Sequence, residues 1–279
     1  MNYLEVQNIA KQTIDYIKTV IKLNMNLREI RKLCEDKMLS LGADSFWYWD
    51  IGAFVFSSDE TTISVSGREY VTADKLISDN DIITIDLSPQ CKNVWGDYAR
   101  TIIIEKGTVV NRIENIQNSE WRNGLQMEEA LHNELIRFVA PDVTFEELYY
   151  FMNDYIRNNG YINLDFLGNL GHSIEKDKND RIYIEKGNKK KLSEVNYFTF
   201  EPHISTKNSL YGYKKENIYF FENGRLVELY NLSLRFLRII HAWMYRQSFL
   251  LLLCDRPDIR MYHALCAYRI PICHWISQR

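Results

Sequence analysis

The chain has 279 residues, of which 46% are hydrophobic and 25% are charged, and its formal net charge at pH 7 is -3. This length can bury a sizeable core, and the ordinary charged fraction argues against a wholly disordered protein. The small negative charge removes the simplest argument for a nucleic-acid binder, because such a protein normally carries a basic surplus.

The sequence carries no pattern that predicts secretion or a membrane span. The N-terminal residues lack a basic segment followed by an apolar one, and the most apolar stretch, Leu232 to Cys254, is interrupted by three arginines. The 5 cysteines are an odd number without paired spacing, which predicts reduced thiols. We therefore expect a cytoplasmic protein with no membrane partner.

The N-terminal part predicts two helices followed by strands. Apolar residues recur at helical spacing over residues 4–24, and Asn26 has the position of an N-cap for a second helix to about Leu41. Aromatic and β-branched runs predict strands over residues 46–56, 61–66, 81–88 and 98–105.

The following part repeats the order of helices and then strands. Helices are expected over residues 119–139 and 144–158, the second opened by a capping box of Thr144 and Glu147. After Gly160, strands are expected over residues 181–184, 197–205, 213–221 and 226–229. The two helix-then-strand halves predict an α+β fold.

The composition changes near residue 231. All 17 lysines lie at or before Lys215, whereas eight of the 17 arginines and three of the five cysteines lie after it. Two interpretations of residues 232–279 stay open, a terminal amphipathic helix packed on the body and a segment of different origin, such as a shifted reading frame. The composition favours the second, so we predict a domain over 1–231 and an atypical tail over 232–279.

Two aspartates stand at the ends of adjacent predicted strands. Asp86 ends an apolar strand, and Asp97 begins the next strand eleven residues later. If the strands pair as an antiparallel hairpin, the two carboxylates can face each other. A divalent cation would relieve their repulsion, although an aspartate at a strand end is also common in turns.

Three further residues strengthen the metal interpretation. His172 follows two glycines, which let a backbone approach a ligand closely, and Glu201 stands in an aromatic run before Pro202. Glu216 starts a strand that ends in an Asn-Gly turn. Each alone has an ordinary structural explanation; together they offer four carboxylates and one imidazole.

The order of these five residues resembles that of one enzyme family. Two motifs carry most of the resemblance: Gly-Asp-Tyr-Ala-Arg-Thr, which contains Asp97, and Phe-Glu-Pro, which contains Glu201. The family is that of methionine aminopeptidase, aminopeptidase P and prolidase, and the resemblance covers roughly residues 4–230. It implies the pita-bread fold, in which two pseudo-symmetric halves have helices covering a curved antiparallel sheet.

The resemblance also implies a site for two divalent metal ions. Asp86 would chelate one ion, Asp97 and Glu216 would bridge both, and His172 and Glu201 would complete the second. This oxygen-rich donor set suits Mn²⁺, Fe²⁺, Co²⁺ or Zn²⁺. Glu201 would move the proton of the attacking water. Two interpretations of Arg100, three residues after Asp97, stay open: a side chain that orients a ligand carboxylate without binding the metal, and an ordinary surface arginine.

Two histidines that the family usually carries near the substrate are missing. One of these histidines precedes the first aspartate in the family, and Ser66 or Arg68 stands near that position here. The other follows the ligand histidine, and the matching residues 175–180 contain no histidine. His203 is expected to take part of their role, because residues two apart on a strand share a face and Glu201 would be its neighbour.

These observations predict a metal-dependent aminopeptidase acting on Xaa-Pro or methionine peptides. Aromatic side chains near the site could line a pocket for the first residue, although most are as well explained as core: Phe46, Trp47, Tyr48, Trp49 and Trp95. Two alternatives remain open, a creatinase-like hydrolase of a small C–N bond and a non-catalytic binding module of the same fold. The expected partner is a peptide, and a homodimer is left open.

Overall fold

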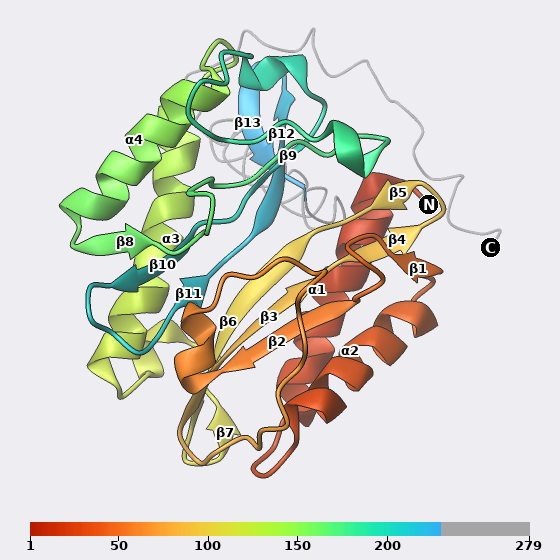
Figure 1. The fold of residues 1–279 in the computed structure, drawn as a ribbon, viewed down its shortest axis with the longest axis vertical. Helices are drawn as coiled ribbons and strands as arrows, with labels where there is room; N and C mark the ends of the chain where they lie inside the picture. Colours follow the sequence, from red (N-terminus) through yellow and green to blue (C-terminus); the bar gives the residue numbers. More distant parts are fainter. Residues whose placement is uncertain (230–279) are drawn as a thin grey trace, which may run out of the picture. The chain divides into compact units, whose positions relative to one another are not determined.

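The computed structural model describes residues 1–229. Within them, every strand pair is antiparallel, and helices lie beside the sheets in two halves (Figure 1). None of the helices in this range is long and apolar enough to cross a membrane. The predicted tail over 232–279 lies outside the described residues, so the proposed boundary stays a prediction.

The first half consists of two helices and a four-stranded sheet. Helices α1 (Tyr3–Val20) and α2 (Leu27–Ser40) lie against a sheet of order β2-β3-β6-β7, with bounds Ala53–Ser57, Asp81–Leu87, Tyr98–Glu105 and Thr108–Val109 (Figure 1). Asn26 caps α2 as predicted, accepting a hydrogen bond from the Arg28 amide. A small sheet of β1 (Ser45–Phe46), β4 (Pro89–Cys91) and β5 (Val94–Trp95) lies at its end.

Side chains alternate between the two faces of this sheet along β3 and β6, so one face packs against the helices and the other faces away from them. Ile83, Ile85 and Leu87 pack in the core beneath α1 and α2. The alternate residues of β3, among them Ile82 and Asp86, point to the other face. Asp86 is therefore directed away from the helix-covered core and toward the second half.

The second half has its own helices and sheets. Helices α3 (Ser119–Phe138) and α4 (Phe145–Asn158) accompany two three-stranded sheets. One sheet has the order β11-β10-β8, with bounds Tyr213–Lys214, His203–Thr206 and Tyr161–Asn163. The other has the order β13-β12-β9, with bounds Arg225–Glu228, Asn217–Glu222 and Phe198–Phe200. The predicted capping box of Thr144 and Glu147 is present at the start of α4.

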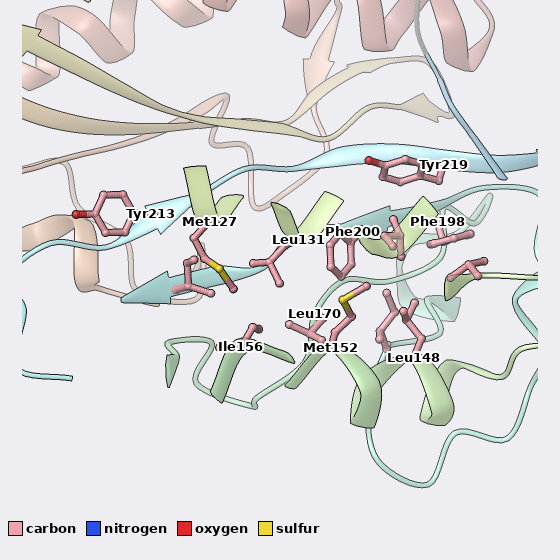
Figure 2. Packing of buried hydrophobic residues seen from close by; sticks show 14 of the residues in the cluster. Met127, Leu131, Leu148, Met152, Ile156, Leu170, Phe198, Phe200, Tyr213 and Tyr219 are labelled. Atoms are coloured by element: carbon pink, nitrogen blue, oxygen red, sulfur yellow. The ribbon is translucent and has the colours of Figure 1, made fainter. Parts of the chain in front are cut away.

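A tightly packed apolar core supports the strands of this half. Figure 2 shows Leu148 and Met152 of α4 beneath Phe198 and Phe200 of β9, and Met127 and Leu131 of α3 on the side of Tyr213, with Ile156 of α4 below them. Leu131, Leu148, Met152, Ile156 and Phe200 have no exposed surface. Because this core fixes β9, it also fixes the place at which β9 ends and Glu201 begins.

The two halves join along β6, β11 and β12. The Glu216 amide donates a hydrogen bond to the Ala99 carbonyl, at 3.0 Å. One step further along, the Lys214 amide donates to the Thr101 hydroxyl at 2.9 Å. The site residues of both halves thus meet at a seam held by hydrogen bonds from the backbone amides of Lys214 and Glu216.

Several strand predictions need correction. Residues 61–66 form the end of a 3-10 helix (Ser58–Thr62) and a loop, and residues 181–184 contribute one isolated bridge instead of a strand. The runs 46–56, 197–205 and 213–221 are each split in two, after Phe46, Phe200 and Lys214. Pro202 has no amide hydrogen to donate to a ladder, which explains the break after Phe200.

A buried carboxyl behind the seam predicts a pH-dependent stability. Glu128 of α3 accepts a hydrogen bond from the Thr101 hydroxyl at 2.6 Å, and burial raises the pKa of Glu128 to about 8. A carboxyl whose pKa is higher in the folded chain stabilises it at low pH, and this contribution is lost as pH rises through about 8. We expect Glu128→Gln to gain stability relative to the wild type between pH 5 and pH 9, as measured by urea unfolding. Glu129→Gln, the exposed neighbour, should show no such gain; an equal gain there would contradict the assignment to Glu128.

Candidate metal centre

Three carboxylates from both halves converge at the seam. Asp86 lies in β3, Asp97 immediately before β6 and Glu216 immediately before β12, and one ligand atom from each lies within 4.8 Å of the others. The register explains part of this arrangement. Asp86 is paired with Ala99, and Asp97, two residues from Ala99, shares its face.

His172 and Glu201 complete the constellation. The His172 Nε2 atom is 3.5 Å from Asp97 Oδ2 and 3.6 Å from Glu201 Oε1. Strands β9 and β12 pair Phe200 with Asn217, so the next step of the register places Glu201 across from Glu216. All five predicted ligands are therefore brought together.

The chemistry of Glu216 fits a cation. Its side chain is completely buried, and neither carboxylate oxygen accepts a hydrogen bond from an N–H group or a hydroxyl within residues 1–229. Burial and the nearby Asp97 and Glu201 carboxylates raise the pKa of Glu216 well above its usual value. An unpaired buried carboxylate is costly, and a divalent cation between Glu216, Asp86 and Asp97 would remove that cost.

The histidine has the protonation state that a metal ligand needs. Burial lowers the pKa of His172 to about 4, so the ring is neutral at pH 7. Its Nδ1 atom is 3.0 Å from the Ser173 carbonyl, which favours the tautomer with hydrogen on Nδ1 and a lone pair on Nε2. That lone pair is on the side of Asp97 and Glu201.

A lysine that the sequence analysis missed lies among the carboxylates. Lys214, the last residue of β11, places its Nζ 2.6 Å from Asp86 Oδ2 and 3.0 Å from Glu201 Oε2. Burial opposes the charge of Lys214, yet the Asp86 and Glu201 carboxylates raise its pKa well above the usual value. Burial would raise the pKa of Glu201, but the charge and hydrogen bond of Lys214, together with His172 and Thr199, outweigh burial and lower the pKa. The only sequence signal was the position of Lys214 two residues before Glu216.

A second missed residue holds Asp97 in place. Gln7 of α1 is buried, and its side-chain amide donates to the Asp97 carbonyl at 2.6 Å while its oxygen accepts from the Asp97 amide at 3.0 Å. These paired bonds fix the backbone at the residue that precedes β6. A glutamine on a predicted amphipathic helix gave no indication of this contact.

Of the two remaining predicted site residues, His203 lines the pocket and Arg100 does not. His203 lines the same pocket as Glu201, and its Nε2 lies 2.7 Å from the Thr61 carbonyl. Arg100 donates hydrogen bonds to the backbone carbonyls of Ala99 and Glu216, and to no ligand carboxylate within residues 1–229. The predicted role of Arg100 is corrected accordingly, because an odd separation from Asp97 directs its side chain to the other face.

A pocket opens over the cluster. Its walls include aromatic residues of residues 47–56, the segment 61–65 and the loop around Phe166, and it reaches Asp86, Asp97 and Glu201. Trp47 and Tyr48 line it, whereas Ser66 and Arg68 do not. A substrate can therefore approach the carboxylates between an aromatic wall and the exposed side chains of Phe166 and Leu167.

Gly171 sets the position of His172. Its φ is 137°, and a Cβ added there would lie 2.3 Å from the Thr199 carbonyl oxygen. We expect Gly171→Ala to reduce the free energy of unfolding by about 2 kcal/mol or more, since backbone strain and a backbone clash act together. Chemical denaturation would measure it. Gly187→Ala provides the control, because Gly187 also has a positive φ but no atom within 4 Å of the added Cβ. Equal losses at both sites would contradict a special role for Gly171.

Comparison with known protein families shows which family the chain belongs to. The sequence profile of Peptidase_M24, described as metallopeptidase family M24, matches residues 2–227. The chain belongs to metallopeptidase family M24. A search of curated proteins finds no match.

Solved structures show the same fold at low sequence identity. The X-Pro aminopeptidase from Thermotoga maritima is 20% identical, with a TM-score of 0.67 over 83% of this chain and 60% of that chain. The prolidase from Pyrococcus furiosus is 19% identical, with a TM-score of 0.67 over 82% and 62%. The methionine aminopeptidase from Thermotoga maritima is 11% identical, with a TM-score of 0.63 over 82% and 94%.

These similarities confirm the pita-bread fold predicted from the sequence. The chain spans about 60% of the length of the X-Pro aminopeptidase and prolidase structures. It matches nearly the whole of the methionine aminopeptidase. The similarity therefore shows the architecture and leaves substrate choice to the side chains of the pocket.

Proposed function

We propose that the chain is a two-metal aminopeptidase that hydrolyses the N-terminal bond of peptides of the Xaa-Pro or methionine type. The observation that carries the proposal is Glu216, a completely buried carboxylate whose two oxygens lack a donor beside Asp86 and Asp97. Membership of a metallopeptidase family supports the same conclusion.

The five side chains would divide between two cations. Asp86 would hold one ion, Asp97 and Glu216 would hold both, and His172 and Glu201 would hold the second. The four carboxylates and the Lys214 ammonium together leave about three negative charges to offset those of the cations. Cations bound there would supply an activated water and polarise the scissile carbonyl.

The protein's own groups would handle binding and protons. Glu201 is ionised, because Lys214 keeps its pKa low, so it can accept a proton and return it to the leaving amine. Burial lowers the pKa of His203 to about 4. Its bond from Nε2 to Thr61 leaves Nδ1 as an acceptor for a peptide N–H. Trp47 and Tyr48 would exclude water from the first residue of the substrate.

Metal content per chain tests the proposal. Protein purified without chelator and then supplied with Mn²⁺ or Co²⁺ should hold close to two ions by elemental analysis, and Asp97→Ala should lose them. A library of Xaa-Pro and methionyl peptides should then be cleaved by the wild type alone. Absence of metal after this treatment would contradict the enzyme and favour a binding module. Metal without peptide cleavage would favour the creatinase-like alternative.

A further inference from the structure

Arg181 is a cation of the pocket that the proposed chemistry does not use. Its Nε donates a hydrogen bond to the Lys178 carbonyl at 2.6 Å. Its guanidinium carbon lies 4.8 Å from the ring centroid of Trp47, 5.7 Å from Tyr48 and 5.6 Å from Tyr183. No ion pair within residues 1–229 involves Arg181, and its two terminal nitrogens make no hydrogen bond there.

Arg181 differs in this respect from the other basic side chains that line the pocket. The charge of Lys214 is balanced by Asp86 and Glu201. The His172 Nε2 atom lies 3.5 Å from Asp97 Oδ2, and the His203 Nε2 atom lies 2.7 Å from the Thr61 carbonyl oxygen. Among the lining residues that the structure describes, Arg181 is therefore the cation without an acidic partner.

The ring contacts limit the distance between Arg181 and the acidic cluster. The His172 ring lies 5.8 Å from Trp47, and the Arg181 guanidinium lies 4.8 Å from the same ring. The His172 ring and the Arg181 guanidinium are consequently no more than about 11 Å apart, which is the sum of these two distances. One residue of an extended peptide spans about 3.5 Å. A group bound by Arg181 would thus be at most about three residues from a peptide bond held beside His172.

We propose that Arg181 binds a carboxylate of the substrate and makes the site selective for short or acidic peptides. This inference rests on the proposed function for its substrate class. A guanidinium offers two parallel donors that match a carboxylate, and the surrounding rings hold the plane of Arg181 and reduce its hydration. The carboxylate is either the C-terminus of a dipeptide or tripeptide, or an acidic side chain next to the scissile bond.

Three probes distinguish these sources: leucyl-proline, leucyl-proline amide and leucyl-aspartate amide. Each is titrated by calorimetry into the full-length chain before Mn²⁺ is added, and its hydrolysis is followed afterwards. The variants are Arg181→Gln, Arg181→Lys and the control Arg68→Gln. Arg68 is matched because its guanidinium also lies over a tryptophan, 4.4 Å from the Trp49 ring, and does not line the pocket.

The wild type should bind a carboxylate-bearing probe about 10- to 100-fold more tightly than leucyl-proline amide. Arg181→Gln should bind every probe as weakly as the wild type binds that amide, Arg181→Lys should keep part of the preference, and Arg68→Gln should keep all of it. Preference for leucyl-proline assigns the C-terminus, and preference for leucyl-aspartate amide assigns the side chain.

Equal binding of the three probes by the wild type, or an unchanged preference in Arg181→Gln, would overturn the inference. An unaltered melting temperature and unaltered affinity for leucyl-proline amide show that Arg181→Gln is folded. If the preference depends on Arg181 but no peptide is hydrolysed after Mn²⁺ is added, the carboxylate site stands and the proposed peptidase activity is wrong. If peptides are hydrolysed but carboxylate-bearing probes bind no more tightly than leucyl-proline amide, the proposed peptidase activity stands and the carboxylate site at Arg181 is wrong.

Discussion

Replacement of Glu216 by glutamine is expected to abolish metal retention and to stabilise the metal-free chain above neutral pH. Burial raises the pKa of Glu216, so the wild type loses stability as this carboxyl ionises at rising pH. A glutamine has no such loss, and we expect a gain of about 2 kcal/mol at pH 8 in urea unfolding. Few substitutions at a buried polar position stabilise a protein, which makes the expectation distinctive.

Added metal should reverse the order of stability. Mn²⁺ should raise the melting temperature of the wild type, because a ligand that binds only the folded state stabilises it, and should leave Glu216→Gln unchanged. Glu29→Gln, the same chemical change at an exposed position of α2, should respond as the wild type does. A Glu216→Gln variant that still gains stability from Mn²⁺ would disprove the assignment of Glu216 as a ligand.

The sequence predicted the elements whose periodicity is set locally. The strand over 98–105 and the helices over 119–139 and 144–158 are found within a residue of their expected ends. Alternation along apolar strands also placed Asp86 on a usable face, since every other residue of β3 packs under α1 and α2. Strong local patterns of this kind require no knowledge of the partner strand.

Contacts between segments distant in the chain could not be predicted from one sequence. Gln7 meets Asp97 across 90 positions, and Lys214 meets Asp86 across 128. Neither side chain has a local pattern that distinguishes it from an ordinary helix or strand residue. The predicted strands 61–66 and 181–184 failed for a related reason, because both segments line the pocket instead of pairing in a sheet. Arg100 was the one misplaced side chain that strand alternation should have corrected.

Replacement of Lys214 by methionine should have effects opposite to those at Glu216. The ammonium of Lys214 is held by Asp86 and Glu201, at 2.6 and 3.0 Å, and about a sixth of its side chain is exposed. Removing one partner of such a buried pair leaves uncompensated charge, so the metal-free variant should lose about 3 kcal/mol of unfolding free energy. The same carboxylates are then free of an internal cation, and Mn²⁺ should bind about 10-fold or more tightly by calorimetry.

Lys214→Arg and Lys215→Met are the controls. Arginine keeps the charge, and Lys215 pairs with Glu129 outside the pocket, at 2.5 Å. Neither change should tighten metal binding. The substitutions at Lys214 and Glu216 together distinguish a metal site from an internal network of ion pairs. In a metal site, removal of a cation raises metal affinity and removal of an anion lowers it. If the cluster were only an internal network of ion pairs, Lys214→Met would destabilise the chain and Mn²⁺ would not restore the loss.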